Sequence, residues 1–287
     1  MSARLDLWEE KSETFRFHEL TISHVHEGSG QNLLCIHGFP TAGFDFDPMW
    51  SGLIEDFNCV APDLIGLGNS SKPDQPLPVS LQADMLEALC MNLGWTKAHI
   101  LAHDVGDTIS QELLARGPKS KIKWKSCIFL NGGLFPETHQ PILIQKLLIS
   151  PLGKWIAKLS SEKTFRASMN RIFSPNYPPS EDFLSDNWGL LVQNQGRTAL
   201  PRLVRYMKER KQNRERWVGI LQTTSVSITL INGSLDPISG SHAAAHYKDL
   251  VPNPRVVHLD DLGHYPHVEN PEIILKEIKK FHIEIRS

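Results

Sequence analysis

The chain has 287 residues, of which 40% are hydrophobic and 22% are charged, and its formal net charge is −2. This composition is typical of a globular protein with a substantial core. A net charge this close to zero gives no sign of the basic surface that nucleic-acid-binding proteins have. No apolar run reaches the roughly 18 residues of a membrane helix. We therefore expect neither nucleic acid nor a membrane as a partner.

The N-terminus and the cysteines both favour a cytoplasmic location. The first residues, MSARLDLWEE, carry charges where a signal peptide would have an apolar run. The cysteines are scattered along the chain and fit neither a disulfide framework nor a zinc site: Cys35, Cys59, Cys90 and Cys127. We expect them to be reduced, and we expect the three in apolar strand-like runs, Cys35, Cys59 and Cys127, to be buried.

The pattern of apolar residues predicts an α/β fold. Residues 15–25 alternate between apolar and polar types, as in a half-buried hairpin. Short continuous apolar runs follow at 32–38, 57–64, 98–104, 125–132, 226–233 and 255–261. Helical patterns lie between or after them at 80–94, 106–116, 239–250 and 271–283. Continuous apolar strands separated by helices indicate a mostly parallel sheet with helices on both faces.

Residues 134–218 interrupt this alternation. They contain several helical stretches and proline-containing breaks but no clear strand. We predict that they form a helical cap inserted into a core made of residues 1–133 and 219–287. Within the cap, the basic stretch KERKQNRER (208–216) is interspersed with glutamates, so we interpret it as a solvated helix face.

The stretch AHDVG (102–106) is the first candidate for chemistry. A strand-like run ends in Asp104, small residues stand two positions away on each side, and a helix follows. This pattern is typical of a nucleophile elbow with Asp in the place of Ser. The alternative is that Asp104 only caps the helix, a role that Asp often fills.

Two downstream loops supply partners in the expected order of nucleophile, acid and histidine. Asp236 follows an apolar strand in INGSLDP, and His264 follows the last strand in LDDLGHYPHVENP. His267 is a rival for the base, and Glu137 or Asn131 could replace Asp236 as the acid.

Backbone donors complete the expected site. The segment CIHGFP (35–40) follows the first strand of the parallel set. Its Phe39 N–H, together with the N–H of Val105, could hold a developing oxyanion. The alternative is that Gly38 and Pro40 serve only to shape a tight turn. Nucleophile, acid, base and oxyanion donors in the right order predict a covalent catalytic site.

These motifs together resemble the α/β-hydrolase superfamily from about residue 13 onward. HGFP (37–40), PDLIGLGNS, the elbow, GSLDP and GHYPHVENP match in order and spacing, and the Asp in the elbow resembles the epoxide hydrolase and haloalkane dehalogenase branch. NGGLFPETH (131–139) and the segment around RKQNRERWVG are not shared widely and resemble one animal protein of the superfamily. The resemblance implies an eight-stranded sheet, a helical cap, and a peptide before Pro40 that can be cis.

The resemblance also narrows the chemistry. Dehalogenases typically carry a Trp directly after the nucleophile, where this chain has Val105. Epoxide hydrolases use tyrosines of the cap as proton donors, and the resemblance implies this role for Tyr177 and Tyr206. We expect His37 to contact substrate as well. The expected substrate is a small apolar organic epoxide, with a dehalogenase, an esterase or a non-catalytic binding protein as alternatives.

Cofactors and assembly complete the expectations. We expect no cofactor. We also expect no metal, because His242 and His246 lie four residues apart on a predicted helix without a third ligand near them in the sequence. A homodimer is one possible assembly.

Overall fold

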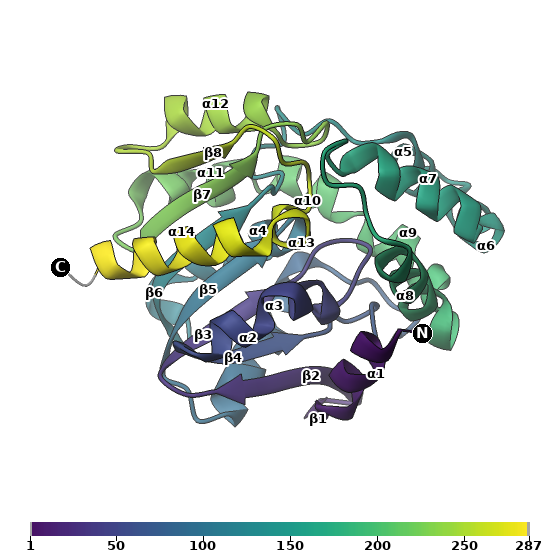
Figure 1. Ribbon diagram of the computed structural model, residues 1–287, viewed down its shortest axis with the longest axis horizontal. Coiled ribbons are helices and arrows are strands. Elements are labelled where there is room, and N and C mark those ends of the chain that lie inside the picture. The colour runs from purple at the N-terminus through teal and green to yellow at the C-terminus, as the bar shows by residue number, and fades with distance from the viewer. Residues whose placement is uncertain (1, 286–287) are drawn as a thin grey trace.

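One eight-stranded sheet runs through the computed structural model, which describes residues 2–285 (Figure 1). Its order is β1-β2-β4-β3-β5-β6-β7-β8. The strands are β1 (Ser12–Phe17), β2 (Leu20–Gly28), β3 (Gln31–Ile36), β4 (Phe57–Pro62), β5 (Lys97–His103), β6 (Lys123–Leu130), β7 (Ser227–Gly233) and β8 (Val256–Leu259). β1 and β2 form the antiparallel hairpin, β2 pairs antiparallel with β4, and all later pairings are parallel. The predicted fold class is confirmed.

Helices cover both faces of the sheet because each central strand is apolar on both sides. In β3, Leu34 and Ile36 pack into one cluster, and Leu33 and Cys35 into the other. The first cluster contains residues of α3 (Val79–Asn92), α4 (Val105–Ala115), α11 (Arg214–Thr223) and α12 (Ser241–Leu250). The second contains residues of α1 (Ala3–Glu10), α2 (Asp47–Ile54) and α14 (Pro271–Glu284). A short helix, α13 (Pro266–Glu269), precedes α14.

A group of helices lies between β6 and β7 in the sequence. They are α5 (Leu143–Leu148), α6 (Gly153–Leu159), α7 (Glu162–Ile172), α8 (Glu181–Val192), α9 (Leu200–Leu203) and α10 (Tyr206–Gln212). In Figure 1, α5 to α9 gather at one end of the sheet, on the right of the view. Three 3-10 turns complete the fold: Gly43–Phe46, Gly117–Lys119 and Gln193–Ala199.

α11 lies where the sequence predicted the end of the cap. The boundary predicted at residue 218 falls inside this helix. Arg216 and Trp217 both donate hydrogen bonds to Glu112 of α4, which is a core helix. We therefore propose that the cap ends before α11, and that α11 belongs to the core.

The helices were also compared with the length and hydropathy of a membrane-spanning helix. Across residues 2–285, none of the helices combines the length and the apolar character needed to cross a bilayer.

Candidate active site

Asp104 lies on a sharp turn between β5 and α4. Its backbone has φ 50° and ψ −108°, a conformation that non-glycine residues rarely adopt. The turn brings α4 very close to β3, since a Cβ on Gly106 would lie 2.4 Å from the Ile36 carbonyl oxygen. Parallel strands end together at this edge of the sheet, where sites form in α/β folds.

The side chain of Asp104 does not cap the helix that it precedes. Asp104 occupies the N-cap position of α4 without making a side-chain capping hydrogen bond. Instead, its Oδ2 accepts a hydrogen bond from the backbone N–H of Phe39 at 2.9 Å. The helix-cap interpretation therefore lacks the hydrogen bond on which it depends.

The loop after β3 is fitted closely around this carboxylate. The peptide bond between Phe39 and Pro40 is cis, as the sequence allowed. A Cβ on Gly38 would lie 2.9 Å from the Cβ of Asp104, so the loop approaches the elbow as closely as a glycine permits. Val105 is the first residue of α4, where backbone N–H groups have no partner within the helix.

His264 and Asp236 form a buried pair. The Nδ1 of His264 lies 2.8 Å from Oδ2 of Asp236, and both side chains are at most 2% exposed. Asp236 also accepts hydrogen bonds from the hydroxyl of Ser239 and the backbone N–H of Ile238, each at 2.7 Å. Held in this way, the carboxylate can orient the imidazole and keep Nε2 free for a substrate or water.

The two alternative acids have other roles. Asn131 donates from its amide to Oδ2 of Asp236 at 3.0 Å, so it supports the acid instead of replacing it. Glu137 forms an ion pair with Arg214 and hydrogen-bonds to His246.

Electrostatics couple the pair to the elbow. Burial favours neutral His264, but the charge of Asp236 and the hydrogen bond to it outweigh burial and raise the pKa of His264 to about 9. Asp104 contributes to this rise. Burial also works against ionised Asp236, yet the charge of His264 lowers the pKa of Asp236 overall.

The other histidines near the motifs are buried and have different surroundings. His37 contacts the Gly38 carbonyl oxygen through Nδ1 and accepts from the Leu64 N–H through Nε2, so both its ring nitrogens are used by the backbone. Burial lowers the pKa of His37 to about 4 and that of His267 to about 3. No side-chain hydrogen bond orients His267, unlike His264.

A cavity of about 70 Å³ contains His264 in its wall. The lining is mostly apolar and comes from the loop after β3, the inserted helices and the loop after β7; it includes Phe39, Pro40, Leu148, Met169, Trp188 and Ile238. Such a lining suits a small apolar ligand.

Tyr206 is hydrogen-bonded to a residue of this cavity, Gln145, and itself lines a smaller cavity together with Phe39 and Val105. Gln145 is buried and lines the cavity, and its Nε2 donates to the hydroxyl of Tyr206 at 3.3 Å. The Tyr206 ring centroid lies 6.2 Å from that of Phe39. Burial, followed by the charge of Asp104, raises the pKa of Tyr206 well above its usual value, so its hydroxyl keeps its proton.

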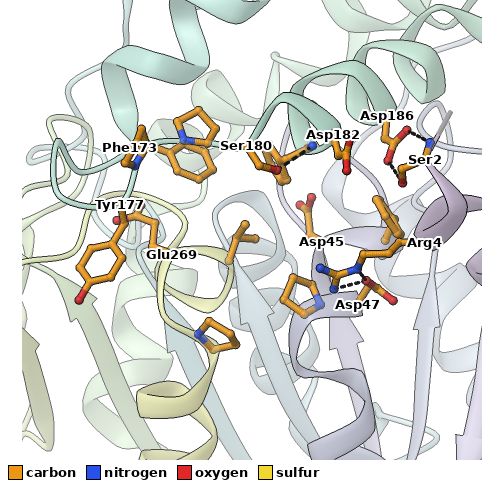
Figure 2. A pocket seen from close by; sticks show the side chains of 17 residues that line it. Ser2, Arg4, Asp45, Asp47, Phe173, Tyr177, Ser180, Asp182, Asp186 and Glu269 are labelled. Carbon is orange, nitrogen blue, oxygen red and sulfur yellow. Dashed lines mark hydrogen bonds and ion pairs between the residues drawn. The ribbon is translucent and has the colours of Figure 1, made fainter.

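Tyr177 lies elsewhere. It is 36% exposed and lines a second, larger cavity of about 360 Å³. Figure 2 shows Tyr177 and Glu269 in the wall of this cavity. His264 and Tyr206 are not among the residues that line it. The structure therefore separates the two cap tyrosines.

Three residues that shape the site were not predicted from the sequence. Gln145 carries no sequence signal beyond its place in the cap. Arg210 was expected on a solvated face, but it is 1% exposed, its Nε donates to Thr108 Oγ1 at 2.6 Å, and it stacks on Tyr206. Glu269 accepts from the backbone N–H groups of Gly263 and Tyr265, which flank His264.

Comparisons with known proteins find relatives that match most or part of the chain. The mesoderm-specific transcript homolog protein of Bos taurus is 36% identical over 290 residues, covering 94% of this chain and 85% of that protein. This is the animal protein that NGGLFPETH and the RKQNRERWVG segment resemble. A soluble epoxide hydrolase of Corynebacterium sp. (strain C12) is 33% identical over 87 residues, which cover 30% of each chain.

Structural similarity extends over nearly the whole molecule. The haloalkane dehalogenase DbeA-M1 loop variant from Bradyrhizobium elkanii superposes with a TM-score of 0.81 at 20% identity, covering 96% of this chain and 97% of that one. At this identity the likeness shows the fold alone. The family model of the alpha/beta hydrolase family matches residues 33–277. The chain therefore belongs to the α/β-hydrolase family.

Proposed function

We propose that this protein is a hydrolase that opens epoxides through an ester on Asp104. An Asp104 carboxylate oxygen bonds to an epoxide carbon, the carbon–oxygen bond of the ring breaks, and the released oxygen takes a proton from Tyr206. Water then gives a proton to His264 and attacks the Asp104 carbonyl carbon. The ester bond breaks as His264 returns this proton to the departing oxygen, which releases the diol, and the proton of the new Asp104 carboxyl group restores Tyr206. The single observation that carries the proposal is the uncapped Asp104 carboxylate, held by the Phe39 N–H at the elbow.

The Phe39 contact supports the second step. The oxyanion that forms on Asp104 during ester hydrolysis grows from a carboxyl oxygen, and the Phe39 N–H already donates to one of these. The N–H of Val105, at the start of α4, is the second donor in the proposal. Esterification also removes the Asp104 charge, which is one of the charges that raise the pKa of His264. The pKa of His264 therefore falls, and more of the imidazole is neutral and able to take a proton from water at the step that needs a base.

Tyr206 supports an epoxide over a halide. Gln145 Oε1 accepts from the Ile142 N–H, so its NH₂ group must be the one that faces Tyr206. The Tyr206 oxygen is then an acceptor in that bond, and its own proton is available to another group. An epoxide oxygen needs such a donor, whereas a halide needs N–H groups beside it.

Haloalkanes are the alternative substrates that the experiment has to include. Trp188 is the one indole that lines the cavity of His264 within residues 2–285, so haloalkanes belong in the substrate panel beside epoxides. The local identity to an epoxide hydrolase favours the epoxides.

The proposal is tested by trapping the ester. His264→Gln is incubated with styrene-type and aliphatic epoxides and with haloalkanes, and the Asp104 peptide is analysed by mass spectrometry. We expect an adduct from epoxides that persists in the variant. His242→Gln, altered on a helix outside the cavity, is the matched control and should turn over without accumulating an adduct.

An isotope measurement completes this test. A single turnover of the wild-type protein in heavy-oxygen water should place the label in Asp104 and leave the first diol unlabelled. A labelled diol with unlabelled Asp104 would mean direct attack by water and would refute the ester. An adduct from haloalkanes alone would assign the dehalogenase alternative, and absence of both adduct and turnover across the panel would favour a binding protein.

A further inference from the structure

Three buried side chains form a cluster on segments that neighbour the candidate active-site residues in the sequence. Asp45, His103 and His267 are each at most 1% exposed, and one nitrogen or oxygen atom of each lies within 4.8 Å of the others. They come from the turn Gly43–Phe46, the end of β5 and α13. In the ester chemistry proposed above, none of the three takes part.

Each of the three side chains has a buried polar atom without a hydrogen-bond partner among residues 2–285. These atoms are Oδ1 of Asp45, Nδ1 of His103 and both ring nitrogens of His267. A buried polar atom without a partner costs about 1–3 kcal/mol, so several in one place need a physical reason. A bound cation would provide one.

The second atoms of two of these side chains are already held as they would be in a metal site. His103 Nε2 lies 2.8 Å from the His264 carbonyl oxygen. A carbonyl can only accept, so Nε2 carries the proton and Nδ1 carries the lone pair. Oδ2 of Asp45 accepts a hydrogen bond from Thr41. Ligating histidines and carboxylates usually have outer partners of these kinds, which fix their orientation.

The larger cavity reaches one member of this cluster, Asp45. Asp45 lines it together with other acidic residues, and Figure 2 shows their side chains around the opening: Asp47, Asp182, Asp186 and Glu269. Arg4 is the one cationic side chain in this lining, and it is paired with Asp47. The excess of carboxylates raises the local concentration of cations.

We propose that Asp45, His103 and His267 form a binding site for a divalent transition-metal ion, with zinc as the representative ion. Two imidazoles and one carboxylate are a common set of three protein ligands for zinc, and a fourth position remains for water. Ligand atoms about 2.1 Å from a tetrahedral zinc ion are roughly 3.4 Å apart, so atoms that now lie within 4.8 Å of one another would have to approach by at most about 1.4 Å.

An ion in this site would hold together three chain segments that carry candidate active-site residues. Asp45 follows Phe39 by six residues, His103 precedes Asp104, and His267 follows His264 by three. An ion bound here would connect the three segments that carry the oxyanion donor, the nucleophile and the base. The metal site takes no part in the proposed ester chemistry, so metal binding can be tested whether or not Asp104 forms an ester.

The test uses metal-stripped, full-length protein and ZnCl₂, followed by calorimetry and thermal unfolding. We expect one zinc ion per chain, and a rise in Tm of roughly 5 °C when free zinc exceeds Kd a hundredfold. Asp45→Asn, His103→Gln and His267→Gln should each weaken binding by more than about tenfold. Thr41→Val, which removes an outer partner, should weaken it by about 10–100-fold.

A matched control removes the exposed histidine pair. His242 and His246 lie four residues apart on α12 and could bind zinc weakly at the surface. The double variant His242→Gln/His246→Gln should bind zinc as the wild type does. Co²⁺ added to the stripped protein should give visible absorption bands that the His267→Gln variant loses.

Several results would overturn the proposal. These are the absence of stoichiometric zinc binding to the wild type, binding that survives all three ligand variants, and binding that disappears in the double control variant. Far-UV circular dichroism of each metal-free variant establishes that it is folded. A variant that does not fold is set aside, and the Co²⁺ spectrum of the wild type then decides whether histidine nitrogens bind the ion.

Discussion

Tyr206 accepts a hydrogen bond from Gln145, and this leaves its own hydroxyl proton uncommitted. The direction of this bond is fixed by Gln145 Oε1, which is occupied by the Ile142 N–H. The guanidinium carbon of Arg210 lies over the Tyr206 ring, 4.6 Å from its centroid, and restricts how the ring can turn. A neutral, oriented phenol whose pKa is affected by the charge of Asp104 is suited to protonating an oxygen that leaves from carbon.

Replacement of Tyr206 tests this assignment. Tyr206→Phe should slow formation of the Asp104 ester by about 10²–10⁴-fold, because the leaving oxygen loses its proton donor. Hydrolysis of the ester should keep its rate, and stopped-flow measurements of the two phases separate these effects. Tyr177→Phe is the matched control, since Tyr177 lies in the other cavity, and both rates should stay as in the wild type. An unchanged ester-formation rate in Tyr206→Phe would assign the proton to a different group.

Elements meet at the elbow with very little space between them. α4 begins directly after Asp104, and its second residue, Gly106, lies against the end of β3. The position of the nucleophile relative to the Phe39 loop therefore depends on a close approach of helix and strand.

Two glycine substitutions measure this packing. In Gly106→Ala, the new Cβ would meet the Ile36 carbonyl oxygen at 2.4 Å, so backbone must move, and we expect a loss of about 1–3 kcal/mol in the free energy of unfolding. Gly219→Ala in α11 meets nothing within 4 Å and should stabilise the protein by about 0.5–1 kcal/mol. Urea unfolding of both variants provides the comparison. Equal stabilities would show that the elbow can relax without cost.

At the scale of the whole molecule, a partly buried ionic network joins three helices. Arg116, which directly follows α4, pairs with Glu87 of α3, with Nη1 and Oε2 2.6 Å apart. Glu112 of α4 accepts hydrogen bonds from Arg216 and Trp217 of α11. Burial works against ionised Glu112, but these hydrogen bonds and the arginine charges lower its pKa overall.

This network predicts a pH dependence of stability. Because the pKa of Glu112 is lowered by folding, its stabilisation is present above the unfolded-state pKa of roughly 4.3 and is lost as the pH falls through the lower folded-state value. Glu112→Gln should reduce the free energy of unfolding at pH 7 by about 1–3 kcal/mol. Denaturant titrations from pH 7 to pH 3 should show this difference shrinking below a pH of about 4.

An exposed ion pair supplies the control for this experiment. Glu181 pairs with Arg166 but is 85% exposed, so Glu181→Gln should change the free energy of unfolding by less than about 1 kcal/mol at any pH. If the two variants behave alike, the Glu112 network does not contribute to the stability of the fold.

The fold was largely readable from the sequence because its signals are local. Each run such as 98–104 is apolar on consecutive residues, which predicts a strand buried on both faces, and β5 (Lys97–His103) lies there. α1 and α2 were not predicted, because each is only eight residues long and packs through few apolar positions. The helices of the insertion were expected as a group without individual bounds.

The sequence by itself determined the order of the motifs that end strands at one edge of the sheet, including those of Asp104, Asp236 and His264. Tertiary structure alone decided which side chains surround them. In the folded chain Arg210 is buried and Gln145 hydrogen-bonds to Tyr206. Tyr177 lines a cavity that does not contain His264, and the rings of His103 and His267 are in contact. The physical reason is that strand and turn preferences act between neighbouring residues, whereas these contacts join segments up to about 160 positions apart and depend on how the helices pack.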